Sequence, residues 1–425
     1  MRNDYFKNKI SFLLIIFNFL TISLLSSEKV ELGIDHFLKG HVSLIKGKRV
    51  GLLTNHTGVN SELISTIELF KNHPDISLSA IFSPEHGLNG RGYAWEKIDN
   101  GALGTIPVFS LHGKSRAPSE EMLKNIDVLV FDIQDIGCRS YTYATTLFYA
   151  MEACAKKNIP VIILDRPNPM GGMIVDGPML EEKWRSFIGY VNVPYCHGLT
   201  IGELGKFFNE EYQIHCSLTV IPMKGWKRWM RFVDTGLQWI PTSPHIPEPD
   251  TPLYYASTGI LGELEMVNIG VGYTLPFKLI GAPWINAEKL AKVLNEQKFE
   301  GVAFSPFYFR PFYGSFKGQD CEGVLIKITD IEKYRPLSVQ YLIMGILKSL
   351  YPQKIKEILQ NMSKTKKRLF CQAVGSEDIL SIFEKEKYIT WKLIEMGRQQ
   401  REAFLQKRNK YLISHYSEAK DHPSP

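Results

Sequence analysis

Short apolar runs alternate with amphipathic segments through the first half of the chain. The runs 48–54, 77–82, 106–111, 126–133, 159–165 and 218–223 read as strands, and several contain almost no polar residue. Segments 61–73, 141–158 and 200–212 carry apolar residues at helical spacing. Continuous apolar strands alternating with helices are typical of a parallel sheet covered on both faces. The pattern predicts a doubly wound α/β domain over residues 28–250.

A proline-rich segment follows this pattern and indicates a domain boundary. Residues 239–257 hold five prolines, a density that interrupts both helices and strands. Beyond it, helices are expected at 286–297, 338–352 and 376–412, with strands at 301–309 and 323–330. We therefore expect a smaller α+β domain over residues 251–415, followed by a disordered tail at 416–425.

The first residues have the composition of a secretory signal. Arg2, Lys7 and Lys9 precede a short apolar run that ends in small residues before Glu28. The run is short for a bilayer span and contains Asn18 and Thr21. Residues 1–27 are therefore interpreted as a cleavable signal peptide, with a membrane anchor as the alternative. An exported protein is expected, periplasmic or secreted, without stable membrane insertion after cleavage.

Charge and cysteine content narrow the class of protein. A formal net charge of +6 over 425 residues is too small and too dispersed to indicate a nucleic-acid partner. The six cysteines form no Cys-x-x-Cys pair, which argues against zinc knuckles and thioredoxin-type redox sites. Export permits disulfides, and Cys196–Cys216 and Cys321–Cys371 are conceivable pairs beside the alternative of six free thiols.

Polar residues follow the ends of the predicted strands. In open parallel sheets ligands bind beyond the carboxyl ends of the strands, so these residues are expected to share one crevice. Taken singly, Asp and Asn here also suit helix caps and turns. The five loops follow the strands that end near 54, 82, 111, 132 and 164, and they carry Asn55, His56, Glu85, His86, His112, Asp132, Gln134, Asp135, Arg139, Tyr141, Asp165, Arg166 and Asn168.

The motifs that are missing exclude several chemistries. No Gly-x-Gly-x-x-Gly or P-loop follows the first strand, no Gly-x-Ser-x-Gly occurs, and no His-x-x-x-His spacing supports zinc. We therefore expect no cofactor and no metal. Paired carboxylates remain, and glycoside hydrolysis uses two. Glu85 is the predicted acid, with Asp132, Asp165 and His86 as further catalytic candidates.

A series of motifs resembles one family along nearly the whole chain. "GLLTNHTGV", "SPEHGLNG", "DVLVFDIQDIGCRSYTY", "LDRPNPMGG", "CHGLTIGEL" and "DTGLQWIPTSPHIP" occur in order, followed by "PFKLIGAPWI" and "DCEGVLI". Together they closely resemble the NamZ-type exo-β-N-acetylmuramidases, from about Val30 to about His415.

The resemblance implies a Rossmann-like N-terminal domain, a smaller C-terminal α/β domain and a cleft between them. It implies release of N-acetylmuramic acid from the non-reducing end of peptidoglycan fragments, so muropeptides or disaccharides are the expected partners. It favours Glu85 as the catalytic residue and adds His197 and Glu263 to the substrate-binding candidates. Arg139 or Arg166 is expected to pair with the lactyl or peptide carboxylate of a muramic acid.

One segment departs from the family pattern. Members commonly carry a second Glu and an Arg after the proline-rich link, and this chain has Ile269 and Val271 there. If those positions contact the substrate, the alternative is a muropeptide- or glycan-binding protein without catalytic activity.

Overall fold

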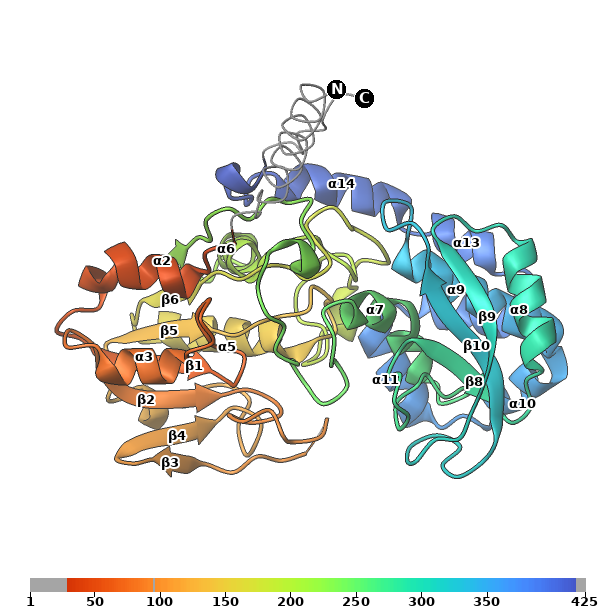
Figure 1. The fold of residues 1–425 in the computed structure, drawn as a ribbon, viewed down its shortest axis with the longest axis horizontal. Helices are drawn as coiled ribbons and strands as arrows, with labels where there is room; N and C mark the ends of the chain where they lie inside the picture. The colour runs from red at the N-terminus through yellow and green to blue at the C-terminus, as the bar shows by residue number, and fades with distance from the viewer. Residues whose placement is uncertain (1–28, 95, 418–425) are drawn as a thin grey trace, which may run out of the picture.

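A seven-stranded sheet forms the centre of the N-terminal domain in this computed structural model, which describes residues 29–94 and 96–417 (Figure 1). The order is β3-β4-β2-β1-β5-β6-β7, and every neighbouring pair is parallel except β3–β4. The strands are β1 (Arg49–Thr54), β2 (Ser77–Ser83), β3 (Gly101–Leu103), β4 (Ile106–Ser110), β5 (Val128–Asp132), β6 (Val161–Leu164) and β7 (Leu218–Ile221). The predicted doubly wound sheet is confirmed.

Helices cover both faces of this sheet because its central strands are apolar on both sides. Along β5, Val128 and Val130 pack in one buried cluster and Leu129 and Phe131 in another. The first cluster includes side chains of α2 (Gly33–Gly40) and α3 (Thr66–Asn72), and the second includes α4 (Glu120–Leu123), α5 (Thr142–Lys156) and α6 (Ile201–Glu211). The strand order reverses between β1 and β5, which is where such sheets place their ligand crevice.

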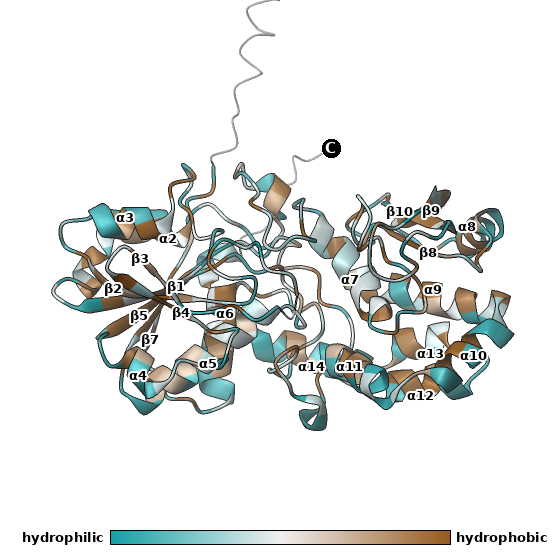
Figure 2. Ribbon diagram, turned by 90° about the horizontal axis from the view of Figure 1, so that it is seen from below, coloured by the Kyte–Doolittle hydropathy of each residue, from teal (hydrophilic) through white to brown (hydrophobic). Residues whose placement is uncertain are grey.

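The C-terminal domain combines a small antiparallel sheet with several helices. Its sheet has the order β8-β10-β9, from β8 (Leu279–Ala282), β9 (Val302–Phe309) and β10 (Cys321–Ile328). The helices are α7 (Thr251–Gly262), α8 (Ala287–Glu296), α9 (Pro336–Leu350), α10 (Pro352–Asn361), α11 (Lys364–Val374), α12 (Asp378–Lys385), α13 (Thr390–Glu395) and α14 (Arg398–Arg408). Buried apolar side chains of both domains belong to one continuous cluster. Figure 2 shows the hydrophobic strands of the large sheet, such as β2 and β5, in brown.

Several predicted boundaries need correction. The expected helix at 61–73 is only α3, because Ser65 rather than Ser61 accepts the capping hydrogen bond, from the Glu68 amide. The expected continuous helix at 376–412 is three helices, since Gly397 adopts a positive φ of 75° and the chain is extended at Glu386. The helix at 200–212 is confirmed as α6, and its N-cap Thr200 forms a capping box.

The end of the chain returns to the N-terminal domain, where α14 lies beside α6 (Figure 1). Tyr416, which the sequence places in a disordered tail, is fully buried instead. Its hydroxyl donates to Asp165 at 2.9 Å and accepts from the Met223 amide at 2.7 Å, so the ordered chain extends through this residue.

Other sequence expectations concern the cysteines and the N-terminus. All six cysteines are buried free thiols. Within the described residues, no helix is both long enough and apolar enough to cross a membrane. The predicted signal peptide, residues 1–27, lies outside the described part of the chain, as do residues 418–425 of the predicted tail.

Candidate active site

A cavity of about 580 Å³ lies where the two domains meet. The N-terminal domain contributes the loop after β2, with Glu85 and His86, and the segment leading into α5. The C-terminal domain contributes one side of α7 and the loop that follows it, with Glu263. The volume suits a small ligand such as one sugar unit, and such cavities at domain junctions are common binding sites.

Glu85 sits at the start of α5. It follows β2 by two residues, is 6 % exposed, and lines the cavity. The hydroxyl of Thr142, the first residue of α5, donates to Glu85 Oε2 at 2.6 Å. A helix N-terminus carries partial positive charge, so both the hydroxyl and the helix stabilise a carboxylate at this position.

Two imidazoles hold the loop that carries Glu85. His86 has a positive φ of 69°, which a residue other than glycine seldom adopts, and its Nδ1 lies 2.7 Å from the Gly92 carbonyl. Since a carbonyl only accepts, His86 donates through Nδ1. His112 Nε2 lies 3.4 Å from Glu85 Oε1, and burial, the largest effect, lowers the pKa of His112 although the Glu85 charge opposes it.

Glu263 has the opposite environment to Glu85. It lines the cavity directly after α7, and burial followed by the charge of Glu265 raises its pKa to about 7. A carboxyl group with that pKa holds its proton over much of the range below neutrality. The cavity therefore contains one carboxyl group with a raised pKa, Glu263, and one that accepts a hydrogen bond from the Thr142 hydroxyl, Glu85.

Several hydroxyl groups also line the cavity. Ser140 Oγ lies 2.7 Å from the Tyr195 hydroxyl and 2.9 Å from the Tyr255 hydroxyl. Tyr141 donates to Thr242 Oγ1 at 2.8 Å, and its ring stands edge-on to Tyr255. Hydroxyls and aromatic rings together suit the polar edges and apolar faces of a sugar.

Sequence reasoning missed several of these residues. Thr142, Ser140, Tyr255 and His245 all line the cavity, and Thr142 also contacts Glu85. Ser140 and Thr142 lie within a quoted motif but were not selected from it, and Tyr255 and His245 lie in the proline-rich segment. His112 follows a predicted strand, but its sequence position alone does not reveal that it faces Glu85. Thr142 could have been identified as a site residue from its position at the N-terminus of a predicted helix, near the carboxyl ends of the strands.

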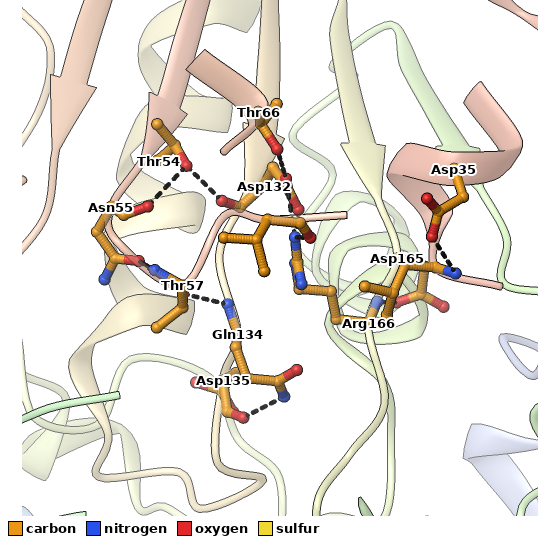
Figure 3. A network of polar contacts seen from close by, with 12 residues as sticks. Asp35, Thr54, Asn55, Thr57, Thr66, Asp132, Gln134, Asp135, Asp165 and Arg166 are labelled. Carbon is orange, nitrogen blue, oxygen red and sulfur yellow. Dashed lines mark hydrogen bonds and ion pairs between the residues drawn. The ribbon is translucent and has the colours of Figure 1, made fainter. Parts of the chain in front are cut away.

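Asp132 and Arg166, which the sequence places in the shared crevice, lie outside the lining of this cavity. Figure 3 shows them beside Thr66 in a network of polar contacts. Asp132 is fully buried, and Arg166 donates to both of its oxygens, at 2.6 and 2.9 Å. Thr66 of α3 also donates to Asp132. These contacts connect the end of β5, the loop after β6 and helix α3. The Asp132–Arg166 pair therefore stabilises the carboxyl-terminal end of the sheet and does not serve to bind a ligand.

Asp165 is likewise absent from the cavity lining. Its oxygens accept from the Gly202 amide and the Thr200 hydroxyl, both at 2.8 Å, and from Tyr416. Burial, followed by the charge of Glu203, raises its pKa to about 7. The catalytic roles predicted for Asp132 and Asp165 have no support in these contacts, which are structural.

Arg139 and His197 are buried where several loops pack against one another. Arg139 donates to the carbonyls of Pro178 and Val193, both at 2.7 Å, and of Val374 at 2.6 Å. His197 Nδ1 accepts from the Leu199 amide at 3.2 Å, and burial lowers its pKa to about 3. Neither side chain lines the cavity, so the pairing of Arg139 with a substrate carboxylate stays a prediction.

The remaining predicted substrate-binding residues lie outside the cavity lining, and Figure 3 labels Asn55, Gln134 and Asp135 among them. Each of these side chains contacts a neighbouring loop or turn. The contacts are Asn55 with Thr57, His56 with the Pro241 carbonyl, Gln134 with the Pro167 carbonyl, Asp135 with the Gly137 amide, and Asn168 with the Leu199 carbonyl. Of the predicted site residues, the structure brings Glu85, His86, Tyr141 and Glu263 together in the cavity.

In residues 29–94 and 96–417, no group of three or more His, Cys, Asp or Glu side chains is placed to hold one metal ion. The carboxyl groups that line the cavity are those of Glu85, Glu263 and Glu265.

Fold and site together define a two-domain α/β protein with a carboxylate-lined cavity at the domain junction. Comparison with known families is consistent with this class. The N-terminal model of exo-β-N-acetylmuramidase NamZ matches residues 50–250, and the C-terminal model matches residues 253–413. The chain therefore belongs to the NamZ family, a family of glycosidases, and the resemblance seen in its motifs is confirmed.

Individual relatives agree with this membership. A peptidoglycan β-N-acetylmuramidase NamZ of Bacillus subtilis (strain 168) is 42 % identical over 327 residues, covering 76 % of this chain and 79 % of that protein. A DUF1343-family crystal structure from Bacteroides fragilis is 42 % identical with a TM-score of 0.85, covering 91 % of this chain and 99 % of the other. A second structure from that organism is 27 % identical with a TM-score of 0.74, covering 92 % and 100 %.

The contacts of Asp132 generate a first prediction. Asp132→Asn removes the charge that compensates the buried Arg166, so the free energy of unfolding should fall by about 3–5 kcal/mol. Urea denaturation followed by circular dichroism measures this loss. Asp127→Asn is the control, because its ion pair with Arg49 is exposed and a much smaller loss is expected. Unchanged stability with abolished turnover would instead make Asp132 a catalytic residue.

Proposed function

We propose that this protein is an exported exo-β-N-acetylmuramidase that releases N-acetylmuramic acid from the non-reducing end of peptidoglycan fragments. The observation that carries the proposal is the pair of carboxyl groups in one cavity, Glu85 from the N-terminal domain and Glu263 from the C-terminal domain. Membership of the NamZ family supports the substrate class, and peptidoglycan-derived saccharides are the expected ligands.

The environments of the two carboxyl groups suggest their roles. Glycosidases need one carboxylic acid to protonate the leaving oxygen and one carboxylate to act as nucleophile or to activate water. Glu263 suits the acid because its pKa is raised to about 7. Glu85 suits the carboxylate because Thr142 donates to it at the start of α5. This assignment revises the sequence prediction, in which Glu85 is the acid.

Other groups position the reacting atoms. His112 faces Glu85 Oε1, and its lowered pKa favours a neutral ring that contacts the carboxylate without a full counter-charge. The hydroxyls of Ser140, Tyr195 and Tyr255 form a connected set along the cavity, suited to orient a sugar by its hydroxyl and acetamido groups.

A second candidate function rests on Ile269 and Val271. Both line the cavity, where family members commonly carry charged residues, and a chain without those residues is a candidate for binding muropeptides without cleaving them. Turnover of any muramide by the purified protein would exclude this alternative, whereas calorimetric binding without turnover would favour it.

Replacement of Glu85 tests the enzymatic proposal. Glu85→Gln should lower kcat/KM for 4-nitrophenyl N-acetyl-β-muramide by about 10²–10⁴-fold, because the amide neither attacks nor activates water. Glu120→Gln, at an exposed position of α4, should retain full activity. Circular dichroism and thermal melting confirm that both variants fold. Equal activity of Glu85→Gln and the wild type would refute the role of Glu85.

The pH profile tests Glu263 as the acid. A group with pKa about 7 holds its proton below that pH and loses it above, so kcat/KM should fall as the pH rises through 7. Glu263→Gln should remove this alkaline limb. It should also impair cleavage of an unactivated disaccharide far more than that of the 4-nitrophenyl glycoside, whose good leaving group needs no proton. Equal impairment on both substrates would contradict the assignment.

Export is the remaining part of the proposal, and it rests on the basic and apolar composition of residues 1–27. The mature protein, expressed from the full-length gene with its signal, should be recovered from the periplasm or medium. Mass spectrometry should then find an N-terminus near Glu28. Recovery of the intact chain from the cytoplasm alone would contradict export.

A further inference from the structure

Two of the buried cysteines lie directly opposite each other on neighbouring extended segments. Cys138 and Cys196 form an isolated antiparallel bridge, and both side chains are buried. Beside this pair, the amide of Arg139 donates to the Tyr195 carbonyl at 2.8 Å. The amide and carbonyl of Cys196 instead bond to Asp176 on its other side, at 2.9 and 3.0 Å. Cys138 and Cys196 are therefore a non-hydrogen-bonded pair of an antiparallel ladder.

This register brings the two cysteine side chains close together. In a non-hydrogen-bonded antiparallel pair the Cα atoms are about 4.5 Å apart, and the two side chains lie on the same face. A disulfide joins Cα atoms about 4.4–6.8 Å apart, so the backbone spacing suits a cross-link. The side chains also interact, since burial, followed by a side-chain hydrogen bond with Cys138, raises the pKa of Cys196.

The other four cysteines lack this geometry. In the described part of the chain, no strand pair or bridge sets two of them opposite each other. Cys321 faces Phe309 across β9 and β10. Cys216, which the sequence offers as a partner of Cys196, lies near Cys154 of α5, because burial, followed by the charge of Cys216, raises the pKa of Cys154. The register thus singles out one pair.

We propose that Cys138 and Cys196 form a disulfide when the protein meets an oxidising thiol–disulfide environment. The structure holds both as thiols and so shows the reduced form. The inference concerns a covalent modification and goes beyond the proposed activity. Only the compartment in which the bond forms rests on the proposed export, because secreted and periplasmic proteins meet oxidising conditions.

The oxidant is a small disulfide such as oxidised glutathione. One cysteine thiolate attacks this disulfide, forms a mixed disulfide and releases one glutathione thiolate. The second cysteine then attacks the protein sulfur of the mixed disulfide and releases the other glutathione thiolate. The two protons of the cysteine thiols pass to the two released thiolates, and two electrons pass from the protein to the reagent.

The bond would join two parts of the cavity wall. Ser140 and Tyr195 line the cavity, and their hydroxyl oxygens are 2.7 Å apart. Ser140 follows Cys138 by two residues, and Tyr195 directly precedes Cys196. The closed loop runs from 138 to 196 and contains α5, whose first residue, Thr142, donates to Glu85. Closing so long a loop constrains the unfolded chain, so oxidation should stabilise the fold.

Burial determines when the bond can form. The thiolate is the reactive species, and buried thiols with a raised pKa react slowly. Oxidation is therefore expected mainly during folding or local opening. A test has to include a sample that folds in the presence of the oxidant.

Disulfide mapping tests the proposal on the wild-type protein. A folded sample and a sample refolded from urea are kept in oxidised and reduced glutathione until their thiol content is constant, and free thiols are then alkylated in denaturant. Trypsin leaves each cysteine in a separate peptide, because a Lys or Arg lies between every two. Peptides 125–139 and 186–206 should be joined by a disulfide, and the other four cysteines should be alkylated.

Two outcomes of the mapping would overturn the proposal. Six alkylated cysteines in both samples would show that the pair does not close. Peptide 186–206 joined to peptide 207–224 would give Cys196 the partner Cys216 and contradict the register argument.

A matched pair of serine variants tests the same bond through stability. Oxidised wild-type protein should melt about 5 °C above protein kept reduced. Cys138→Ser should lose this difference, and Cys154→Ser, which replaces another buried thiol but keeps the pair, should retain it. Each comparison is between two redox states of one variant, so a general destabilisation by serine does not affect it. The same difference in Cys138→Ser as in the wild type would overturn the assignment.

None of these measurements requires turnover. Linked peptides in a protein that cleaves no muramide would uphold the disulfide and refute the muramidase. Cleavage of a muramide by a protein whose six cysteines all remain alkylated would refute the disulfide and uphold the muramidase.

Discussion

The geometry of the cavity depends on how Arg139 holds the two domains together. Its guanidinium group is buried, and it donates to carbonyls from loop 178–193 and from the end of α11 in the other domain. Burial lowers its pKa to about 10, so the group remains charged at neutral pH. Because Thr142 follows only three residues later, this contact also fixes the start of α5, and with it the carboxylate of Glu85.

The sheet could be predicted from the sequence because its strands are apolar on both faces. The directions of the polar side chains that follow these strands were harder to predict. Asp132 illustrates the reason. It has the same parity along β5 as Val128 and Val130, which pack beneath α2 and α3. Its carboxylate therefore points toward Thr66 of α3, away from the cavity. The alternation of side chains along a strand predicts this direction of the Asp132 side chain. The position of Asp132 near the end of the strand does not predict it.

Glu85 reaches the cavity because it lies beyond the end of β2, where the strand alternation no longer applies. The left-handed backbone of His86 turns the loop, and the hydrogen bond to Gly92 holds that turn. Sequence motifs located this loop correctly. The same motifs do not predict the environment of Glu263. Its raised pKa results from burial at the domain junction and from the charge of Glu265, and neither effect follows from the residue pattern of a strand.

The return of the C-terminal segment to the first domain affects how the protein can move. The chain crosses between domains once before α7 and again at α14, where Arg408 donates to the carbonyls of Gly172 and Gly198. Hinge closure uses a few loop or element-terminal residues that absorb large changes in backbone dihedral angles. Here a rotation of one domain against the other would act on both crossings, and it would load the contacts of Arg408 and Tyr416 as well as the link before α7.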